Sequence, residues 1–411
     1  SARDYCQKEL MPGILDANRN EIFNKSIYKD MGQLGFLGAP IDGYGCAGTN
    51  YVSYGLIARE IERVDSGYRS MMSVQSSLVM FPIYKYGTED QKNYYLPKLA
   101  KGELIGSFGL TEPDAGTDLQ GIQTKAVLEG DHYIVNGSKM WITNGRFANP
   151  LPVLVKTDTS AQPAHKGMSV LLMDQTAEGF EISKDIGKMG YKGPESCVLM
   201  FSDVKVHKSM LLGEVEGKGL QQVLSSLEIG RLNIAARAVG IAQEAYNQAL
   251  IYSKERKAFG KEINEFQAIQ LKLAEMATNV QASRLLTWWS ASMADQGKRV
   301  DTEAGMAKYF SSEVAIANAL DAMRIHGGMG YSMETGIEMG YRDARITRIY
   351  EGTNEINRML SVAELTKRHL KSKEINLTKA GKNVPRLLFK QALPFSSNCG
   401  KTVPSKYDII A

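Results

Sequence analysis

Apolar positions divide the chain into a helical stretch, a strand-rich stretch and a second helical stretch. From Ala2 to about Lys101 they recur at helical spacing, as in Tyr51–Val64, where they are mixed with arginine and glutamate. Between about residues 106 and 213, short runs rich in β-branched and aromatic residues predict strands. Intervals of three and four return after Gly219 and predict a bundle of long helices. Strands and helices do not alternate, which argues against a doubly wound parallel sheet.

The same pattern places individual elements. Asn136-Gly137 separates two short runs and predicts the turn of a β-hairpin. Further strands are predicted at Pro152–Lys156, Met168–Met173 and Cys197–Val206. Three apolar series predict bundle helices: Leu232, Ala235, Val239, Ala242, Tyr246 and Ala249; Ile269, Leu273, Met276 and Val280; and Ala307, Phe310, Val314 and Ala317. We therefore predict domains over 1–105, 106–213 and 214–365, followed by an extension over 366–411.

Composition narrows the protein class. With 411 residues, 43% hydrophobic and 23% charged, the chain is typical of a globular protein of two to three domains, which excludes disordered, collagen-like and coiled-coil proteins. It has no run of 18 apolar residues, so we expect no membrane-spanning helix. The four cysteines lie too far apart for a CxxC metal site or a dense disulfide framework, so we expect no structural metal and a reducing compartment.

Charge is concentrated at the C-terminal end. Residues 366–411 contain ten lysines and arginines against Glu374 and Asp408, a balance of +8, so the rest of the chain carries about −4 of the net +4. Scattered lysines among proline, serine and glycine favour a solvated extension over a phosphate- or lipid-binding one, and we expect no nucleic-acid partner. Because the chain begins at Ser1 without a leader pattern, we interpret it as a processed or trimmed form.

The glycine-rich motif at Gly43–Gly48 does not indicate a dinucleotide-binding domain in this sequence. Gly43-Tyr-Gly45-Cys-Ala-Gly48 matches the GxGxxG string of dinucleotide-binding proteins. The apolar piece before it contains Pro40 and has no βαβ context. We interpret it as a surface loop between helices.

Several segments could carry chemistry, each with a structural alternative. The loop Phe108–Asp118 could bind a polar ring edge or a phosphate through backbone amides and hydroxyls, or be a plain turn. Trp141-Ile-Thr143 could stack on and hydrogen-bond to a planar cofactor, or contribute a core tryptophan. Glu351 precedes a glycine that would let a ligand approach the backbone closely, or it is an ordinary acidic residue of a loop.

Two further segments lie at the ends of predicted helices. Arg256 could bind phosphate, or complement a helix dipole. The run His326–Tyr331 could allow close ligand approach, or end a helix; His326 lacks a partner at metal-binding spacing, so we predict no metal site.

Together, in their order and spacing, these segments resemble the acyl-CoA dehydrogenase family from Tyr5 to Leu365. In the N-terminal half, Gly43–Gly48, Glu60–Ser70 and Gln75–Met80 are most similar to the glutaryl-CoA dehydrogenase branch. The resemblance implies an α+β fold with an N-terminal α-helical domain, a central β-barrel or β-sandwich domain and a C-terminal four-helix bundle.

The resemblance also implies FAD between the β domain and the bundle. Thr143 would face the reactive flavin nitrogen, and some contacts would come from a neighbouring subunit, which implies a dimer at least; the family is usually a homotetramer, a dimer of dimers. The flavin contacts within the subunit are Phe108, Leu110, Thr111, Gly116, Thr117, Trp141 and Thr143, those from its neighbour are Arg256, Phe259, Gln267, Arg324, Gly327 and Gly328, and Thr353 and Glu355 complete the site.

Glu351 matches the family's general base, which removes a proton from C2 of an acyl thioester while a hydride leaves C3. Some relatives carry the base immediately before the position of Arg231, where this chain has Gly230. The backbone N–H of Glu351 and a flavin ribityl hydroxyl would stabilise the developing enolate. Excluding water from such a carboxylate raises its basicity.

Arg69 matches the arginine that binds the distal carboxylate of glutaryl-CoA; the alternative is an ion pair of Arg69 with Asp65. Acyl-CoA would then be held by Arg69, Ser70, Glu62, Tyr350 and Arg231. We accordingly predict oxidation and decarboxylation of glutaryl-CoA to crotonyl-CoA, as in lysine and tryptophan degradation, with electrons passed to electron-transfer flavoprotein.

The second half departs from the glutaryl branch. Ile349–Arg358 is similar to short- and branched-chain enzymes of the family, whereas Gly190–Ser196 differs both from those enzymes and from the glutaryl branch. A non-decarboxylating short- or branched-chain acyl-CoA dehydrogenase is therefore the alternative, and a non-catalytic assembly or binding protein on the same fold is the alternative of another class. The expected compartment is the mitochondrial matrix or the bacterial cytoplasm.

Overall fold

A computed structural model describes residues 1–183 and 185–372. The chain forms two compact units, Ser1–Ser361 and Val362–Ala411, and all that follows concerns the first unit unless stated. The predicted basic extension begins within the last helix, and its residues 373–411 lie outside the described part of the chain.

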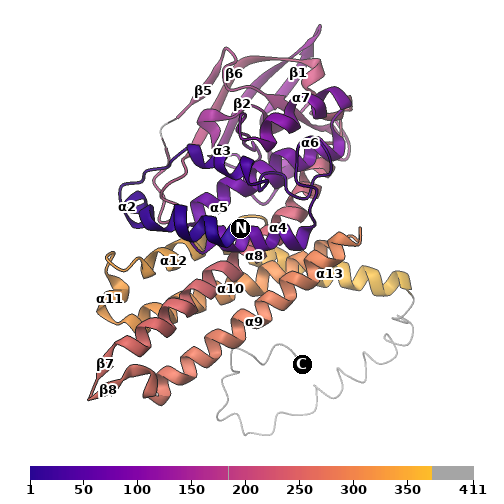
Figure 1. Cartoon of the computed structure of the whole chain (residues 1–411). Helices are drawn as coiled ribbons and strands as arrows, with labels where there is room; N and C mark the ends of the chain where they lie inside the picture. The colour runs from indigo at the N-terminus through magenta and orange to yellow at the C-terminus, as the bar shows by residue number, and fades with distance from the viewer. Residues whose placement is uncertain (184, 373–411) are drawn as a thin grey trace. The chain divides into compact units, whose positions relative to one another are not determined.

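The first hundred residues are helical, as predicted (Figure 1). Asp65 caps the central helix α5, its carboxylate accepting a hydrogen bond from the Tyr68 amide at 2.9 Å. The backbone then continues through a π-helical stretch, η3, into α6, so residues 66–86 form one long helical segment that is buried along α5 and most of η3. These elements are α1 (Ala2–Tyr5), η1 (Cys6–Leu10), α2 (Ile14–Arg19), α3 (Ser26–Gln33), α4 (Tyr51–Glu62), α5 (Ser66–Ser73), η3 (Val74–Met80), α6 (Phe81–Tyr86) and α7 (Glu89–Ala100).

A six-stranded sheet occupies the middle of the chain, with the order β4-β3-β1-β2-β6-β5. Neighbouring strands are antiparallel except β1 and β3. Apolar side chains of β2, β3, β4 and β6 form a core of their own on this sheet. The strands predicted at 152–156, 168–173 and 197–206 are confirmed as β3, β4 and β6. The strands are β1 (Lys125–Glu129), β2 (His132–Thr143), β3 (Leu151–Lys156), β4 (Met168–Met173), β5 (Phe180–Ile182) and β6 (Ser196–His207).

The hairpin turn predicted at Asn136-Gly137 is wrong. Both residues lie inside the continuous strand β2, at a shift of register against β6. A side chain at Gly137 would lie 2.6 Å from Oγ1 of Thr124, so the glycine allows close packing of backbones rather than a turn. The turn is Gly130-Asp131, because Glu129 pairs with His132 across it. This glycine–aspartate pair is also a two-residue hairpin signal.

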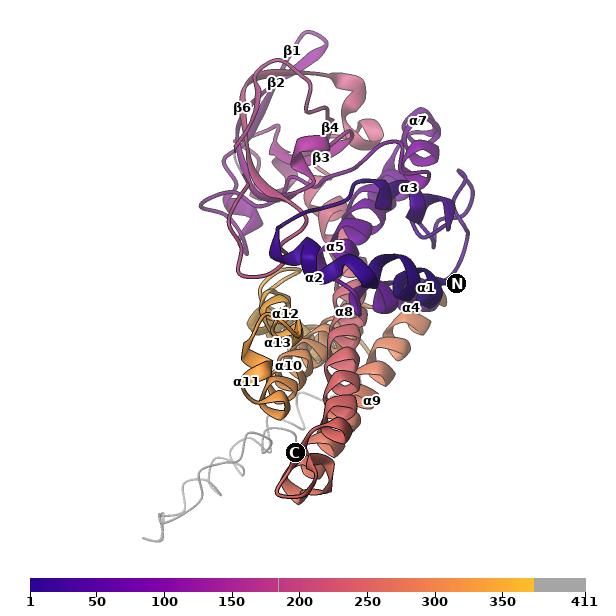
Figure 2. The same cartoon turned by 60° about the vertical axis from the view of Figure 1, so that its left-hand side comes forward.

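Long helices dominate the last third of the first unit (Figure 2). Helices α8, α9 and α10 pack against one another, as the three apolar series predict. Small side chains line the buried contact of α8 with α10, including Ala238 and Ala315, which allows the two helices to approach closely. The helices are α8 (Gly219–Glu255), α9 (Gln267–Asp295), α10 (Asp301–His326), α11 (Gly328–Tyr331), α12 (Ile337–Ala344) and α13 (Asn354–Ser372), and a small hairpin of β7 (Lys257–Ala258) and β8 (Lys261–Glu262) joins α8 to α9.

Loops and short turns complete the unit. The Gly43–Gly48 segment is a loop, as expected, and its three glycines all have positive φ. Among the described residues, none of the helices has the length and apolarity needed to cross a bilayer. The 3₁₀ turns are η2 (Met11–Gly13), η4 (Leu119–Gly121), η5 (Gly145–Phe147), η6 (Ala164–Gly167), η7 (Lys208–Met210), η8 (Leu212–Glu214), η9 (Ile263–Glu265) and η10 (Arg345–Arg348).

Candidate active site

Glu351 lies in a tight loop between η10 and α13. Its φ of 54° and that of Gly352, 82°, place two consecutive residues in the left-handed region. This conformation costs a residue with a side chain on the order of 1–3 kcal/mol and persists only where its surroundings fix it. They do so through the two carbonyls: that of Glu351 accepts from Nε of Arg231 at 3.2 Å, and that of Gly352 accepts from Nζ of Lys308 at 2.7 Å and Nδ2 of Asn357 at 2.8 Å.

The carboxylate of Glu351 fits against a glycine of α8. A Cβ at Gly230 would lie 2.6 Å from Oε2 and 2.8 Å from Oε1 of Glu351. The residue is only half-buried as a whole, yet Oε2 is shielded from solvent and has no hydrogen-bond partner. Burial raises the pKa of Glu351 to about 7, against the opposing charges of Arg231, Arg69 and Lys308. A carboxyl group with this pKa can accept a proton near neutral pH.

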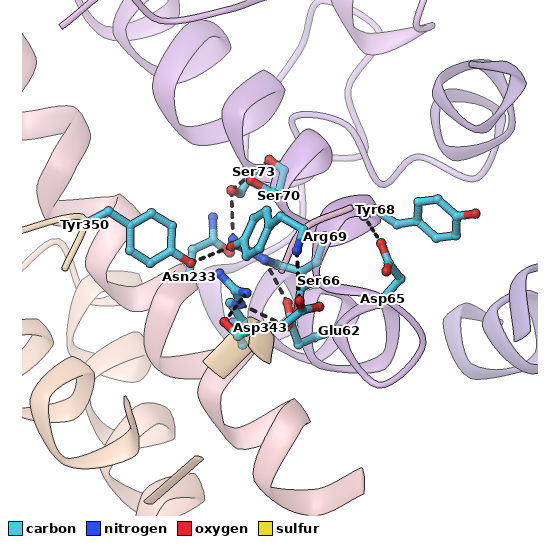
Figure 3. Close-up of polar contacts among 12 residues, drawn as sticks. Glu62, Asp65, Ser66, Tyr68, Arg69, Ser70, Ser73, Asn233, Asp343 and Tyr350 are labelled. Atoms are coloured by element: carbon cyan, nitrogen blue, oxygen red, sulfur yellow. Dashed lines mark hydrogen bonds and ion pairs between the residues drawn. The ribbon is translucent and has the colours of Figure 1, made fainter. Parts of the chain in front are cut away.

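Arg69 and Glu62 form a buried ion pair beside this loop (Figure 3). The Arg69 side chain is fully buried; it donates to Oε2 of Glu62 at 3.1 Å through Nε and to Oγ of Ser73 at 2.8 Å through Nη1. Oε1 of Glu62 accepts from Nε of Arg237 at 2.9 Å and from the Ser66 hydroxyl. The alternative ion pair of Arg69 with Asp65 is not formed, because Asp65 is the cap of α5.

Two aromatic hydroxyls link Arg69 to the residue before Glu351. The hydroxyls of Tyr191 and Tyr350 are 2.7 Å apart, and Nη2 of Arg69 donates to the Tyr191 hydroxyl at 3.4 Å. The guanidinium of Arg237 lies 4.3 Å from the centre of the Tyr191 ring and 5.6 Å from that of Tyr350. The network therefore joins a helix of the first hundred residues, the loop between β5 and β6 and the loop of Glu351.

Sequence reasoning predicted Glu62, Arg69, Tyr350, Arg231 and Glu351 at this site, and the structure brings them together. Predicted Ser70 is buried, and its carbonyl accepts from the Ser73 hydroxyl at 3.2 Å. Four further residues of the site were not predicted: Ser73, Tyr191, Arg237 and Lys308. Ser73 lies one helical turn after Arg69 and could have been found from that spacing. The others come from distant segments, and no local pattern marks them.

The predicted flavin segments adjoin one another in the sheet region. The Met140 amide donates to the carbonyl of Thr111 at 2.7 Å, and the Ser107 hydroxyl donates to that of Thr143 at 2.5 Å. Lys139 and Glu112 form a buried ion pair of 2.7 Å beneath them. The Trp141 side chain is 53% exposed at a φ of 65°, so the alternative of a core tryptophan is wrong. Phe108, Leu110, Thr111 and Thr143 are half-buried, and Gly116 and Thr117 are exposed.

An open indole face beside hydroxyls and backbone amides suits a flat, polar-edged ring system. The donor set of these two segments therefore fits an isoalloxazine. Among the described residues, no group of three metal-ligating side chains is present.

The residues predicted to contact the flavin of a neighbouring subunit lie away from the surface formed by the Thr111 and Trp141 segments. Arg256 caps the end of α8, the Phe259 side chain at the tip of the small hairpin is 97% exposed, and Gln267 begins α9 (Figure 1). At the end of α10 the residues Arg324, Gly327 and Gly328 are also exposed. Thr353 and Glu355 flank Asn354, the first residue of α13; Thr353 is half-buried and Glu355 is exposed.

Sequence models of the acyl-CoA dehydrogenase family match most of the chain. The N-terminal domain matches residues 1–103, the middle domain residues 107–204 and the C-terminal domain residues 217–366.

Two curated proteins illustrate the similarity. The 3-(aryl)acrylate reductase of Clostridium sporogenes is 41% identical over 89% of this chain and 97% of its own length. The mitochondrial short-chain specific acyl-CoA dehydrogenase of Homo sapiens is 39% identical over 89% of this chain and 88% of its own.

Solved structures agree in fold. A chain in a structure titled for the electron transferring flavoprotein of Acidaminococcus fermentans has a TM-score of 0.86 and 40% identity, covering 89% of this chain and 95% of that one. Butyryl-CoA dehydrogenase of Megasphaera elsdenii has a TM-score of 0.86 and 38% identity, covering 89% and 96%. Glutaryl-CoA dehydrogenase of Mycobacterium smegmatis in complex with FADH2 has a TM-score of 0.85 and 34% identity, covering 89% and 92%.

Proposed function

The chain belongs to the acyl-CoA dehydrogenase family, whose members are flavin-dependent CH–CH oxidoreductases, and we propose that it oxidises a short acyl-CoA thioester between C2 and C3. The single observation that carries this proposal is the Glu351 carboxylate, whose Oε2 is dry and unpartnered against Gly230. Keeping a buried, unpartnered carboxylate ionised costs free energy. Carboxyl groups with pKa values perturbed in this way concentrate at catalytic sites.

Glu351 acts as the general base in this proposal. Its carboxylate would take the proton from C2, and its backbone N–H and the nearby positive charge of Arg231 would stabilise the negative charge that develops on the thioester oxygen. The segments of Thr111 and Trp141 would hold FAD, which would supply the acceptor for the hydride that leaves C3. The products are the enoyl-CoA, reduced flavin and a protonated Glu351. Positioned proton transfer of this kind is worth about 10²–10⁴-fold in rate.

Similarity to known proteins favours a short-chain substrate over glutaryl-CoA. The named short-chain, butyryl-CoA and arylacrylate proteins are 38–41% identical to the chain, and the glutaryl-CoA dehydrogenase is 34% identical. The expected similarity to the glutaryl branch is therefore a more distant one, and the short-chain alternative becomes the main proposal.

One observation supports glutaryl-CoA as a second candidate. Two buried guanidinium groups, Arg69 and Arg237, share the one carboxylate of Glu62, and Nη1 of Arg237 has no partner. Burial raises the pKa of the nearby Asp65 to about 7, so this carboxyl group is not a full counter-charge at neutral pH, and burial also raises the pKa of Asp343. A carboxylate at the far end of an acyl chain would supply the missing negative charge.

A panel of acyl-CoAs tests both candidates. Purified protein should be yellow, and butyryl-CoA should bleach the flavin without release of CO₂. Bleaching by glutaryl-CoA with CO₂ release, and not by butyryl-CoA, would move the protein to the decarboxylating branch. A colourless protein that binds acyl-CoA without turnover would support the non-catalytic alternative.

Partners and assembly follow as proposals. We propose that reduced flavin is reoxidised by electron-transfer flavoprotein, since a chain 40% identical to this one occurs in a structure titled for that protein. The exposed positions of Arg256 and Phe259 support a flavin site completed by a second subunit within a homotetramer. The relatives include a mitochondrial and a bacterial enzyme, so both predicted compartments stay open.

A further inference from the structure

Lys308 is a fully buried lysine in the first third of α10, and it is hydrogen-bonded to the residue that follows the proposed base. Its Nζ donates to the carbonyl of Gly352 at 2.7 Å and to Oδ1 of Asn354 at 2.9 Å. Neither partner carries a charge. A buried ammonium without a hydrogen-bonded carboxylate is costly, so its retention requires an explanation.

The hydrogen bonds of Lys308 fix the loop that presents Glu351. Gly352 and Asn354 stand on either side of Thr353, at the junction of the left-handed loop with α13. Asn354 is itself held, because its Nδ2 donates to Oγ of Ser312 at 2.9 Å and to Oε1 of Glu313 at 2.8 Å, one turn further along α10. Through its hydrogen bonds to Gly352 and Asn354, the lysine therefore holds the Glu351 loop against α10.

We propose that Lys308 is a positioning residue for the oxidation: through the Gly352 carbonyl it holds the strained loop of Glu351, and its buried positive charge keeps that carboxylate ionised. The inference rests on the proposed function of Glu351. The carboxylate is faced by Arg231 from α8, Arg69 from α5 and Lys308 from α10, and the positive charge of each lowers its pKa. Burial lowers the pKa of Lys308 to about 8, so the lysine is mainly protonated at neutral pH.

Three substitutions separate the hydrogen bond from the charge. Lys308→Met removes both, Lys308→Gln removes the charge and keeps a donor, and Lys308→Arg keeps both. Lys272→Met is the matched control, because Lys272 pairs with Asp321 between α9 and α10 of the same bundle. The holoenzymes are compared by the rate of flavin reduction with butyryl-CoA against pH and by infrared titration of the Glu351 carboxyl, assigned with Glu351→Gln.

We expect the midpoint of Glu351 to rise in Lys308→Met and Lys308→Gln, by about one pH unit for the loss of one nearby opposite charge. Reduction near pH 6 should then fall about tenfold more than reduction above the midpoint. Lys308→Arg and Lys272→Met should keep the wild-type midpoint. If Lys308→Met does not fold, the comparison of the glutamine and arginine variants carries the same test.

An unchanged midpoint in Lys308→Gln or Lys308→Met, by both readouts, would overturn the inference and leave Lys308 as a packing residue. A wild-type protein that is not reduced by any acyl-CoA of the panel would instead overturn the proposed function. The two failures are thus distinguishable.

Discussion

The carboxylate of Glu351 fills the space that a side chain at Gly230 would need: a Cβ atom at position 230 would lie only 2.6 Å from Oε2 of Glu351. The glycine is therefore a condition for the acid to enter the bundle. A carboxylate side chain at position 230 and the carboxylate of Glu351 therefore exclude one another in this structure.

We expect Gly230→Ala to slow flavin reduction about 10²-fold, because displacing a reacting group by about 1 Å can cost that much. The fold should survive, since the clash is with the far end of a flexible side chain. Stopped-flow reduction and thermal melting check both statements. Gly55→Ala is the control: its Cβ would make an ordinary 3.7 Å contact with Ala236, so turnover should be unchanged.

Replacing Glu351 by Gln should lower the rate of flavin reduction by about 10²–10⁴-fold, because the amide cannot take the proton from C2. FAD should remain bound, since the side chain is not among the flavin segments. Absorbance spectra and single-turnover kinetics measure the two effects. Turnover close to wild type would contradict the assignment of the base.

Turnover should rise with pH through about 7. Burial raises the pKa of Glu351 to about 7, and the ionised form is the active one, so the rate falls as the pH drops below this value. The measurement is the pH profile of single-turnover reduction at saturating substrate. A profile flat between about pH 5 and 8 would show that the carboxyl is not buried during reaction.

The same raised pKa predicts a stability effect of opposite direction. A carboxyl whose pKa is higher in the folded than in the unfolded state stabilises the fold most below its unfolded pKa, and this contribution is lost as the pH rises through about 7. At pH 8 the free energy of unfolding of Glu351→Gln should therefore exceed that of the wild type by on the order of 1–3 kcal/mol, and its unfolding temperature should be higher. At pH 4 the two proteins should unfold at similar temperatures. Calorimetry at the two pH values tests the sign.

Replacing Arg69 by Met should change substrate preference more than it changes the reaction. We expect glutaryl-CoA, if bound at all, to lose affinity and butyryl-CoA to keep its rate, because only the former has a distal carboxylate. Glu62 keeps Arg237 as a partner, so the loss of stability should stay below the 3–5 kcal/mol of a fully broken buried pair. Equal losses with both substrates would assign Arg69 to structure alone.

Much of the fold is readable from apolar spacing, because each strand and long helix buries one face or stripe. The hairpin turn was misplaced, since Asn136-Gly137 favours a turn locally while pairing with β1 and β6 extends the strand. At the site, residue type and order indicate Glu351 and Arg69. They do not show that Gly230 leaves room for the acid, or that Lys308 and Tyr191 reach the loop, because these contacts span 40 to more than 150 positions of sequence.

The hydrogen-bonded network of Arg69, Tyr191 and Tyr350 links three segments that are far apart in the sequence. Its members are contributed by α5, by the loop between β5 and β6 and by the last part of the first unit, so they are brought together only by the complete fold. Loss of any one of these segments would remove a member of the network and separate Arg69 from the residue before Glu351.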